Sequence, residues 1–360
     1  MNTVKTLSIA TALLCSSLAL SQQSNASECG LSCCIAAGMD GVGSNNGFNI
    51  SLQYDTMIMK TNKTGTSTIS STQIINNKLA GVTTGMYTVS TKMVMQKIAA
   101  NVSYRIDQDN ALLLTLPYII NDMDMQMGMK MMGNITYKNM TMDTIQGIGD
   151  VSLLYIRNLY KDSEFRTRKR ISIGIGIKAP TGTSDARNAK GELVHMMMQA
   201  GTNAWDALFS INSVLAFGQH DDGGAQWIIS PSLFYQANTR NDLGYKVGNR
   251  LNYDISTRYR LTSLFNIKFD LNGVKSEQDS TDGTIDTATG NIAYQNVNGN
   301  VLDNIANTGL HSIFISPGFQ WILDDGYNLS GEYRIPVYQD VNGIQQVTDN
   351  WYFLRVSKSF

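Results

Sequence analysis

Strict two-residue alternation of apolar and polar side chains is the feature that most constrains this chain. In residues 171–178 (ISIGIGIK) every odd position is isoleucine, and the even positions are serine, glycine and lysine. Residues 251–260 and 265–272 alternate in the same way, with charged residues on the polar side. Successive side chains of a strand point to opposite faces, so each segment predicts a strand with one apolar and one polar face. Such strands, about ten residues long and repeated without a helical pattern, are typical of a transmembrane β-barrel.

Residues 1–26 have the pattern of a secretory signal peptide that is removed on export. Lys5 gives a basic start, an apolar segment spans about 7–20, and Ser24-Asn25-Ala26 is a small-residue cleavage site. No later apolar run approaches the ~20 residues that a membrane helix needs. The exported chain is therefore either soluble or a β-barrel. A formal net charge of −1 argues against a nucleic-acid partner.

The alternating segments predict an all-β fold, a transmembrane antiparallel up-and-down β-barrel of about twelve strands in residues 47–360. The predicted strands are 47–60, 92–106, 110–122, 147–160, 168–179, 206–218, 225–236, 249–261, 263–275, 311–323, 327–338 and 348–360. Long and short connections alternate between them throughout, as short periplasmic turns and long external loops do. A soluble fold has no reason to show this order. We therefore expect the outer membrane of a Gram-negative bacterium as its location.

The C-terminal strand ends in Phe360, and a terminal aromatic residue is the usual ending of outer-membrane barrels. We expect the barrel-assembly machinery to recognise this strand. The other expected partners are outer-membrane lipid and lipopolysaccharide. The sequence does not define an oligomeric state.

The segment 27–46 precedes the first predicted strand and could plug the barrel. It is rich in glycine and contains the three cysteines that remain after signal removal, Cys29, Cys33 and Cys34. An odd number clustered in six residues is not a disulfide framework. The three thiolates can chelate Cu(I) or Zn(II), or they form one disulfide and one free thiol.

Several motifs along the chain are similar to those of a known family. They are Leu116-Pro117-Tyr118, GIGDVSLLY (147–155), IKAPTGTSD (177–185), QAGTNAWDALF (199–209), GYKVGN (244–249), SPGFQW (316–321) and IPVYQDVNGIQQV (335–347). In these the chain resembles the outer-membrane "transporter" family named for the meta-pathway of phenol degradation. The resemblance implies an outer-membrane barrel, and it implies transport only loosely.

Methionine is concentrated in one stretch, residues 123–142 (MDMQMGMKMMGNITYKNMTM), where eight of twenty residues are methionine. On the predicted topology, the methionines after Met39 lie at external strand ends or in external loops. The candidate soft-metal ligands among them are Met57, Met59, Met93, Met95, Met123, Met125, Met127, Met129, Met131, Met132, Met196, Met197 and Met198, with His195 beside the last three.

Strand parity places these methionines on the lumen side. Met57 and Met59 share parity with polar positions of the first strand, and Met93 and Met95 do so in the second. The odd positions of 123–131 also face inward if strand 110–122 continues unbroken. One β-bulge would reverse that orientation.

The sequence allows three functional interpretations. Thioethers are soft ligands that select Cu(I) and, by the same chemistry, Ag(I), so a Met-lined external mouth is expected to bind or pass these ions, and Cu(I) is the one ligand or cofactor that the sequence suggests. Alternatively, flexible methionines line a channel for small hydrophobic or aromatic compounds. The third interpretation is a non-transporting surface or scaffold barrel. The sequence has no Walker-type P-loop and no zinc-protease histidine pair, so we expect no enzymatic activity.

Overall fold

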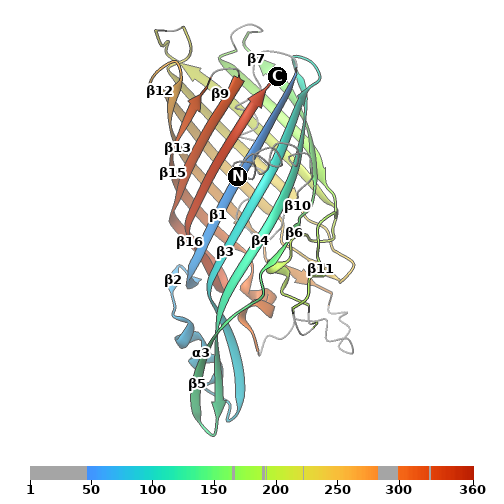
Figure 1. Cartoon of the computed structure of the whole chain (residues 1–360), viewed down its shortest axis with the longest axis vertical. Helices are drawn as coiled ribbons and strands as arrows, with labels where there is room; N and C mark the ends of the chain where they lie inside the picture. Colours follow the sequence, from blue (N-terminus) through green and yellow to red (C-terminus); the bar gives the residue numbers. More distant parts are fainter. Residues whose placement is uncertain are drawn as a thin grey trace, which may run out of the picture.

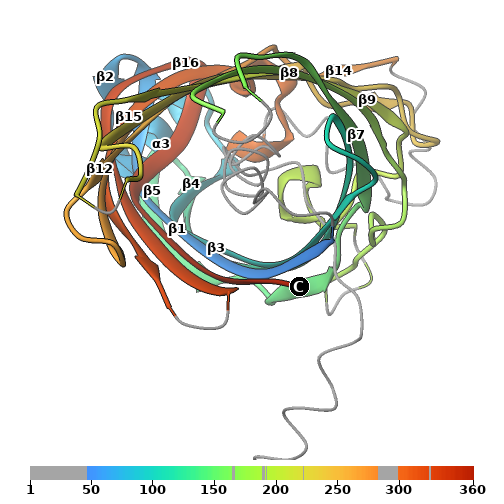
Figure 2. The same ribbon diagram turned by 90° about the horizontal axis from the view of Figure 1, so that it is seen from above.

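The strands form one closed antiparallel barrel (Figures 1 and 2). The computed structural model describes residues 47–163, 167–188, 191, 193–221, 223–282, 299–323 and 326–360. The wall strands follow one another in chain order, and pairing of β16 with β1 closes the sheet. Their bounds are β1 Phe48–Gly65, β3 Gly85–Arg105, β4 Asn110–Met131, β7 Ser152–Lys161, β8 Lys169–Lys178, β9 Asp206–Phe217, β10 Trp227–Ala237, β12 Arg250–Arg260, β13 Phe265–Ser276, β15 Leu310–Ile322 and β16 Tyr327–Ser359.

β16 contributes two passes to the wall. Its residues 328–341 pair with β15, and its residues 341–359 pair with β1. The two halves lie side by side, since the rings of Tyr333 and Tyr352 stack with centroids 5.0 Å apart. Gly343 has a φ of +55°, which a tight turn between the halves requires. When the two halves of β16 are counted separately, the described wall has about twelve strands, as the sequence predicts.

The alternation of the sequence becomes the two faces of the wall. In β8, Ile173 and Ile175 are 40% and 58% exposed, whereas Ser172 is fully buried. In β1, Leu52 is 58% exposed and Gln53 is fully buried. An outward apolar belt around a polar interior suits a lipid-facing barrel. In the described part of the chain, no helix has both the length and the apolar character to cross a bilayer.

Two segments predicted as loops, 61–91 and 123–146, hold regular structure at the long-loop end of the barrel (Figure 1). Strand pairing continues there beyond the lipid-facing belt, and in 123–131 it follows the alternating methionines. β3 and β4 extend past the barrel and are joined by β5, and helix α3 packs on them. The elements in these segments are β2 Ser67–Thr68, α3 Ser71–Leu79, β5 Asn134–Thr141 and β6 Ile145–Ile148.

The predicted strand 147–160 is also interrupted. β6 pairs with β4 at residues 118–121, and β7 pairs with β4 at residues 110–115. The break falls opposite Pro117, which has no N–H to donate to a neighbouring strand. Gly149 and Asp150 lie in the break, and Asp150 instead binds the loop described below.

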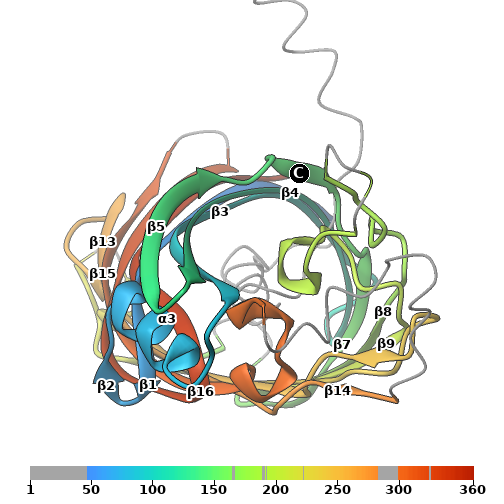
Figure 3. The same ribbon diagram turned by 90° about the horizontal axis from the view of Figure 1, so that it is seen from below.

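The described residues of the loop 179–205 and residues 299–309 fold into the barrel rather than away from it (Figures 2 and 3). The first contains the 3₁₀ turn η1 (Met196–Met198), and the second contains η3 (Val301–Asp303) and η4 (Ile305–Asn307). Met198 is fully buried and Val301 is nearly so. A small two-stranded sheet of β11 (Tyr245–Lys246) and β14 (Ser280–Thr281) lies nearby.

Candidate functional site

Five methionines on three adjacent strands face the lumen in direct register. Met57 of β1 stands opposite Met95 of β3, and Met59 stands opposite Met93. Met93 is in turn opposite Met123 of β4. These side chains, together with Met125, are 5% exposed or less. The inward parity predicted for them is confirmed, and their role as metal ligands stays a prediction.

These five methionines and Met125 form one apolar cluster with residues from across the lumen. Ile145, Phe314 and Trp351 join them from other parts of the wall, and Val194 and Met198 join from the inserted loop. We call this set the methionine cluster. The rings of Phe314 and Trp351 meet edge to face at 5.6 Å, and methionine sulfur packs well against such rings. The inserted loop thus contributes apolar side chains to the same cluster as the wall strands.

The inserted loop is held at its base by a buried charge cluster. The Lys178 ammonium contacts Asp150 at 2.5 Å and Asp206 at 2.7 Å, and all three side chains are at most 1% exposed. It also donates to Thr202 Oγ1 at 2.6 Å. Asp150 accepts further hydrogen bonds from the backbone of Thr202 and of Gly182. Buried charges need such pairing and hydrogen bonding, and here they have it.

Three motifs that are distant in sequence meet at this base. Gly149, Gly182 and Gly201 touch backbone to backbone, and a Cβ on Gly182 would lie 2.6 Å from backbone atoms of the other two. Only glycine allows this approach. These glycines belong to the motifs GIGDVSLLY, IKAPTGTSD and QAGTNAWDALF, whose sequences alone predict no structural role. The available signal was a glycine and a charged residue in each of the three stretches, Asp150, Lys178 and Asp206.

His195 links the two inserted loops. Its Nδ1 hydrogen-bonds Asp303 Oδ1, and Asn300 Nδ2 lies 3.0 Å from its Nε2. Both ring nitrogens are therefore engaged within the protein, and a metal-bound imidazole at this position would need that network to open. Burial raises the pKa of the Asp303 carboxyl, and the contact with His195 opposes this shift. Met196 and Met198 are buried inside the barrel, whereas the sequence predicted that they lie in an external loop.

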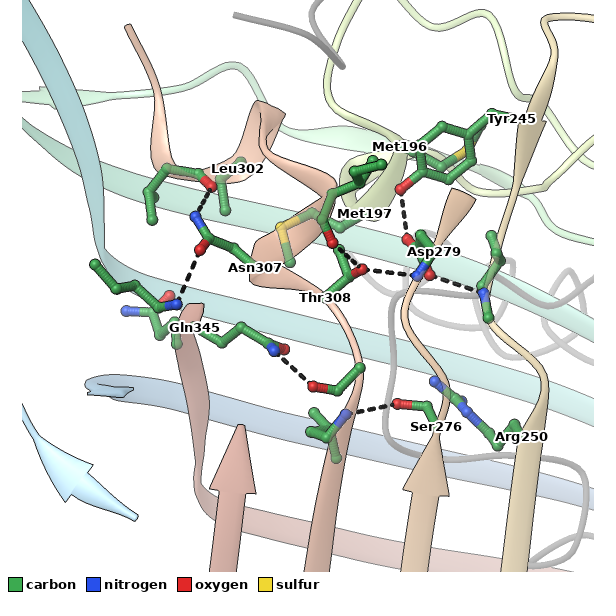
Figure 4. A pocket seen from close by; sticks show the side chains of 18 residues that line it. Met196, Met197, Tyr245, Arg250, Ser276, Asp279, Leu302, Asn307, Thr308 and Gln345 are labelled. Atoms are coloured by element: carbon green, nitrogen blue, oxygen red, sulfur yellow. Dashed lines mark hydrogen bonds between the residues drawn. The ribbon is translucent and has the colours of Figure 1, made fainter. Parts of the chain in front are cut away.

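A chamber of about 110 Å³ lies between the inserted loops and the wall strands β12, β13, β15 and β16 (Figure 4). Its polar side includes Asp279, which accepts from the Tyr245 hydroxyl and from the Gly248 amide. Burial raises the pKa of the Asp279 carboxyl, and these hydrogen bonds oppose the shift. Its apolar lining is Met196, Met197, Val247, Val301, Leu302, Ile305, Leu310 and Ile344.

Below the methionine cluster, toward the short-turn end, the lumen is polar and charged. Lys97 pairs with Asp55 at 3.2 Å, directly beside the first methionine pair. Glu332 pairs with Lys268 and, at 3.2 Å, with Arg334, whose guanidinium lies 4.3 Å from the Trp351 ring centroid. A polar cavity of about 290 Å³ opens at the short-turn end. The interior thus changes from apolar to charged along the barrel axis.

The remaining candidate methionines lie outside this cluster. Met129, Met131 and Met132 are 38%, 60% and 95% exposed on the projecting β4–β5 hairpin. They were expected at the mouth of the lumen, and they lie beyond it. Met132 has a φ of +48° and belongs to the hairpin turn. The predicted signal peptide, the predicted plug segment and Cys29, Cys33 and Cys34 lie outside the described residues. Within the described ranges, no three His, Cys, Asp or Glu side chains are grouped to hold a metal ion.

The closed wall, its apolar outer belt and its polar interior define an outer-membrane β-barrel. The chain belongs to the family described as "Putative MetA-pathway of phenol degradation", whose model matches residues 80–302. This confirms the resemblance seen in the motifs. No curated protein matches the chain.

Solved structures of outer-membrane proteins are similar to this chain. An outer membrane channel from Pseudomonas putida F1 is similar at 10% identity with a TM-score of 0.56, over 88% of this chain and 96% of that chain. The toluene transporter of P. putida is similar at 8% identity with a TM-score of 0.45, over 88% of this chain and 91% of that chain. The first likeness confirms the predicted fold.

Proposed function

We propose that this protein is an outer-membrane channel that admits small apolar compounds, aromatic ones included. The observation that carries the proposal is the chamber at the long-loop end, where apolar side chains of two inserted loops face the wall. Ligand sites for apolar molecules are concave and mostly apolar, with few polar groups that set orientation. The phenol pathway in the family description agrees with this class of solute.

The interior suits apolar solutes better than hydrophilic ones. A hydrophilic solute entering from the long-loop end would meet the methionine cluster, which places thioethers and two aromatic rings inside the barrel. Transfer of an unpaired polar group into such surroundings costs free energy, and transfer of an apolar group does not. Flexible methionine side chains can also repack around solutes of different shape.

The experiment measures initial uptake of radiolabelled toluene by cells with and without the protein. Leu302→Asp places a charge in the chamber lining and should reduce uptake several-fold. Leu243→Asp adds the same charge at an exposed loop position, where the leucine is 39% exposed, and should leave uptake unchanged. Equal uptake by all strains, with each barrel shown to be folded by heat-modifiable gel migration, would refute the proposal.

A second candidate function, binding of the soft monovalent ions Cu(I) or Ag(I), is supported by a different observation. Seven buried methionines gather in the methionine cluster. Leucine or isoleucine would fill the same volume without the oxidation risk of methionine. Thioethers select soft cations and carry no proton, so their binding of such ions would be insensitive to pH.

A further inference from the structure

The methionines of β4 continue out of the barrel as one row of increasing exposure. Met123 and Met125 are 2% and 3% exposed, Met127 is half-buried, Met129 is 38% exposed and Met131 is 60% exposed. Met132 follows β4 in the hairpin turn and is 95% exposed. The row therefore joins open solvent to the buried methionine cluster. The β4–β5 hairpin extends beyond the barrel at the long-loop end (Figure 1). These outer methionines cannot be explained as core packing, because they are exposed.

The row occupies one face of the projecting sheet. Even positions of β4 face helix α3, since a Cβ on Gly128 would lie 2.2 Å from Ile75 and the Lys130 ammonium donates to the Leu79 carbonyl at 2.7 Å. Alternation then puts the odd positions on the opposite face. Helix α3 thus shields one side of the sheet and leaves the thioether side uncovered.

Methionines on neighbouring strands stand opposite this row. Met86 of β3 is paired with Met129, and Met140 of β5 is paired with Met125. Directly opposite residues of an antiparallel pair have Cβ atoms about 4.5–5.5 Å apart. Two flexible thioethers at that spacing can reach one ion between them. The pair at Met93 and Met123 continues the same arrangement inside the barrel.

We propose that the exposed methionines of the projecting hairpin, Met86, Met129, Met131 and Met132, form an outer binding site for Cu(I) or Ag(I) that loads the methionine cluster. This inference rests on the second candidate function. The ion moves by exchange of one thioether for the next along the row, with no change of oxidation state and no proton transfer. Two-residue steps along a strand span about 6.6 Å, which adjacent long side chains bridge.

The test uses Ag(I), which has the same preference for thioethers and needs no reductant. Purified full-length barrel in detergent is titrated with Ag(I), and loading is followed by stopped-flow competition with a chromophoric silver chelator. The outer variant carries Met→Leu changes at 86, 129, 131 and 132. The inner variant carries them at 59, 93 and 123. Tyr137→Leu changes the same hairpin without removing sulfur and serves as the control.

Wild type and control should bind Ag(I) at two classes of site, with sulfur as the scatterer in X-ray absorption. The outer variant should lose one class and load the other at least tenfold more slowly, whereas the inner variant should keep only the outer class. Unchanged loading in the outer variant would overturn the outer site and leave the methionine cluster as a metal site. Absence of Ag(I) binding in the wild type would overturn both, and toluene uptake would remain a separate question.

Discussion

Replacing Lys178 with methionine should be among the most destabilising single changes in this barrel. The ammonium lies 2.5 Å and 2.7 Å from two carboxylates that are essentially inaccessible to solvent. Its removal leaves Asp150 and Asp206 as uncompensated buried charges. Breaking a buried pair in this way costs roughly 3–5 kcal/mol, far more than the pair contributes relative to an apolar replacement. The base of the inserted loop should open as a result.

Urea unfolding of the barrel in lipid vesicles measures this loss. Lys161→Met is the matched control, because Lys161 pairs with Asp109 at 2.8 Å at a short turn where the aspartate is 46% exposed. That change should cost less than about 1 kcal/mol. Adding Asp150→Asn and Asp206→Asn to Lys178→Met should recover part of the loss, since no buried charge remains. Equal costs for the two lysine variants would refute the reasoning.

Three further predictions concern the loops and the projecting sheet. His195→Ala should leave the buried Asp303 carboxylate unpaired and weaken docking of the inserted loop by about 1–3 kcal/mol, measured as faster hydrogen exchange at residues 194–199. Gly128→Val should push its side chain into Ile75 and release helix α3, measured as faster proteolysis of the helix, with unchanged cleavage contradicting the packing. Burial raises the pKa of Asp279, so the folded chain binds this proton more tightly than the unfolded chain does. The free energy of unfolding that this group contributes is therefore present in acid, and it is lost as the pH rises above 3.8 and through the raised pKa. In Asp279→Asn the melting temperature should therefore depend less on pH than in the wild type. The same dependence of the melting temperature on pH in both proteins would contradict this prediction.

The wall of the barrel could be predicted from local pattern. A residue that alternates with Gln53 or Ser172 must face the other side of the sheet, so the lipid belt and the lumen parity of Met57 and Met95 follow from sequence alone. The same logic failed at the strand ends. Beyond the lipid belt both faces meet water or protein, and pairing continues where hydrophobic alternation no longer reports it, as in the last residues of β1, Lys60–Gly65 (KTNKTG).

The inserted loops could not be predicted, because their positions depend on contacts between distant residues. A long connection such as 180–205 reads equally well as an external loop, and Met198 has no local feature that marks it as buried. The contacts that hold it inside are a backbone crossing of three glycines and a lysine shared by two aspartates. Each partner comes from a separate motif, and only the closed barrel brings them together.

The sequence by itself determined the class of protein, the topology and the face of each strand, since these follow from a two-residue period and from the order of long and short connections. The tertiary structure decided what the lumen contains. Both ring nitrogens of His195 have hydrogen-bond partners from another loop. The methionines of 123–132 divide into a buried group and an exposed group, and an apolar chamber forms between two loops and the wall. Parity gives direction only, whereas burial and distance depend on which remote segments fold into the same space.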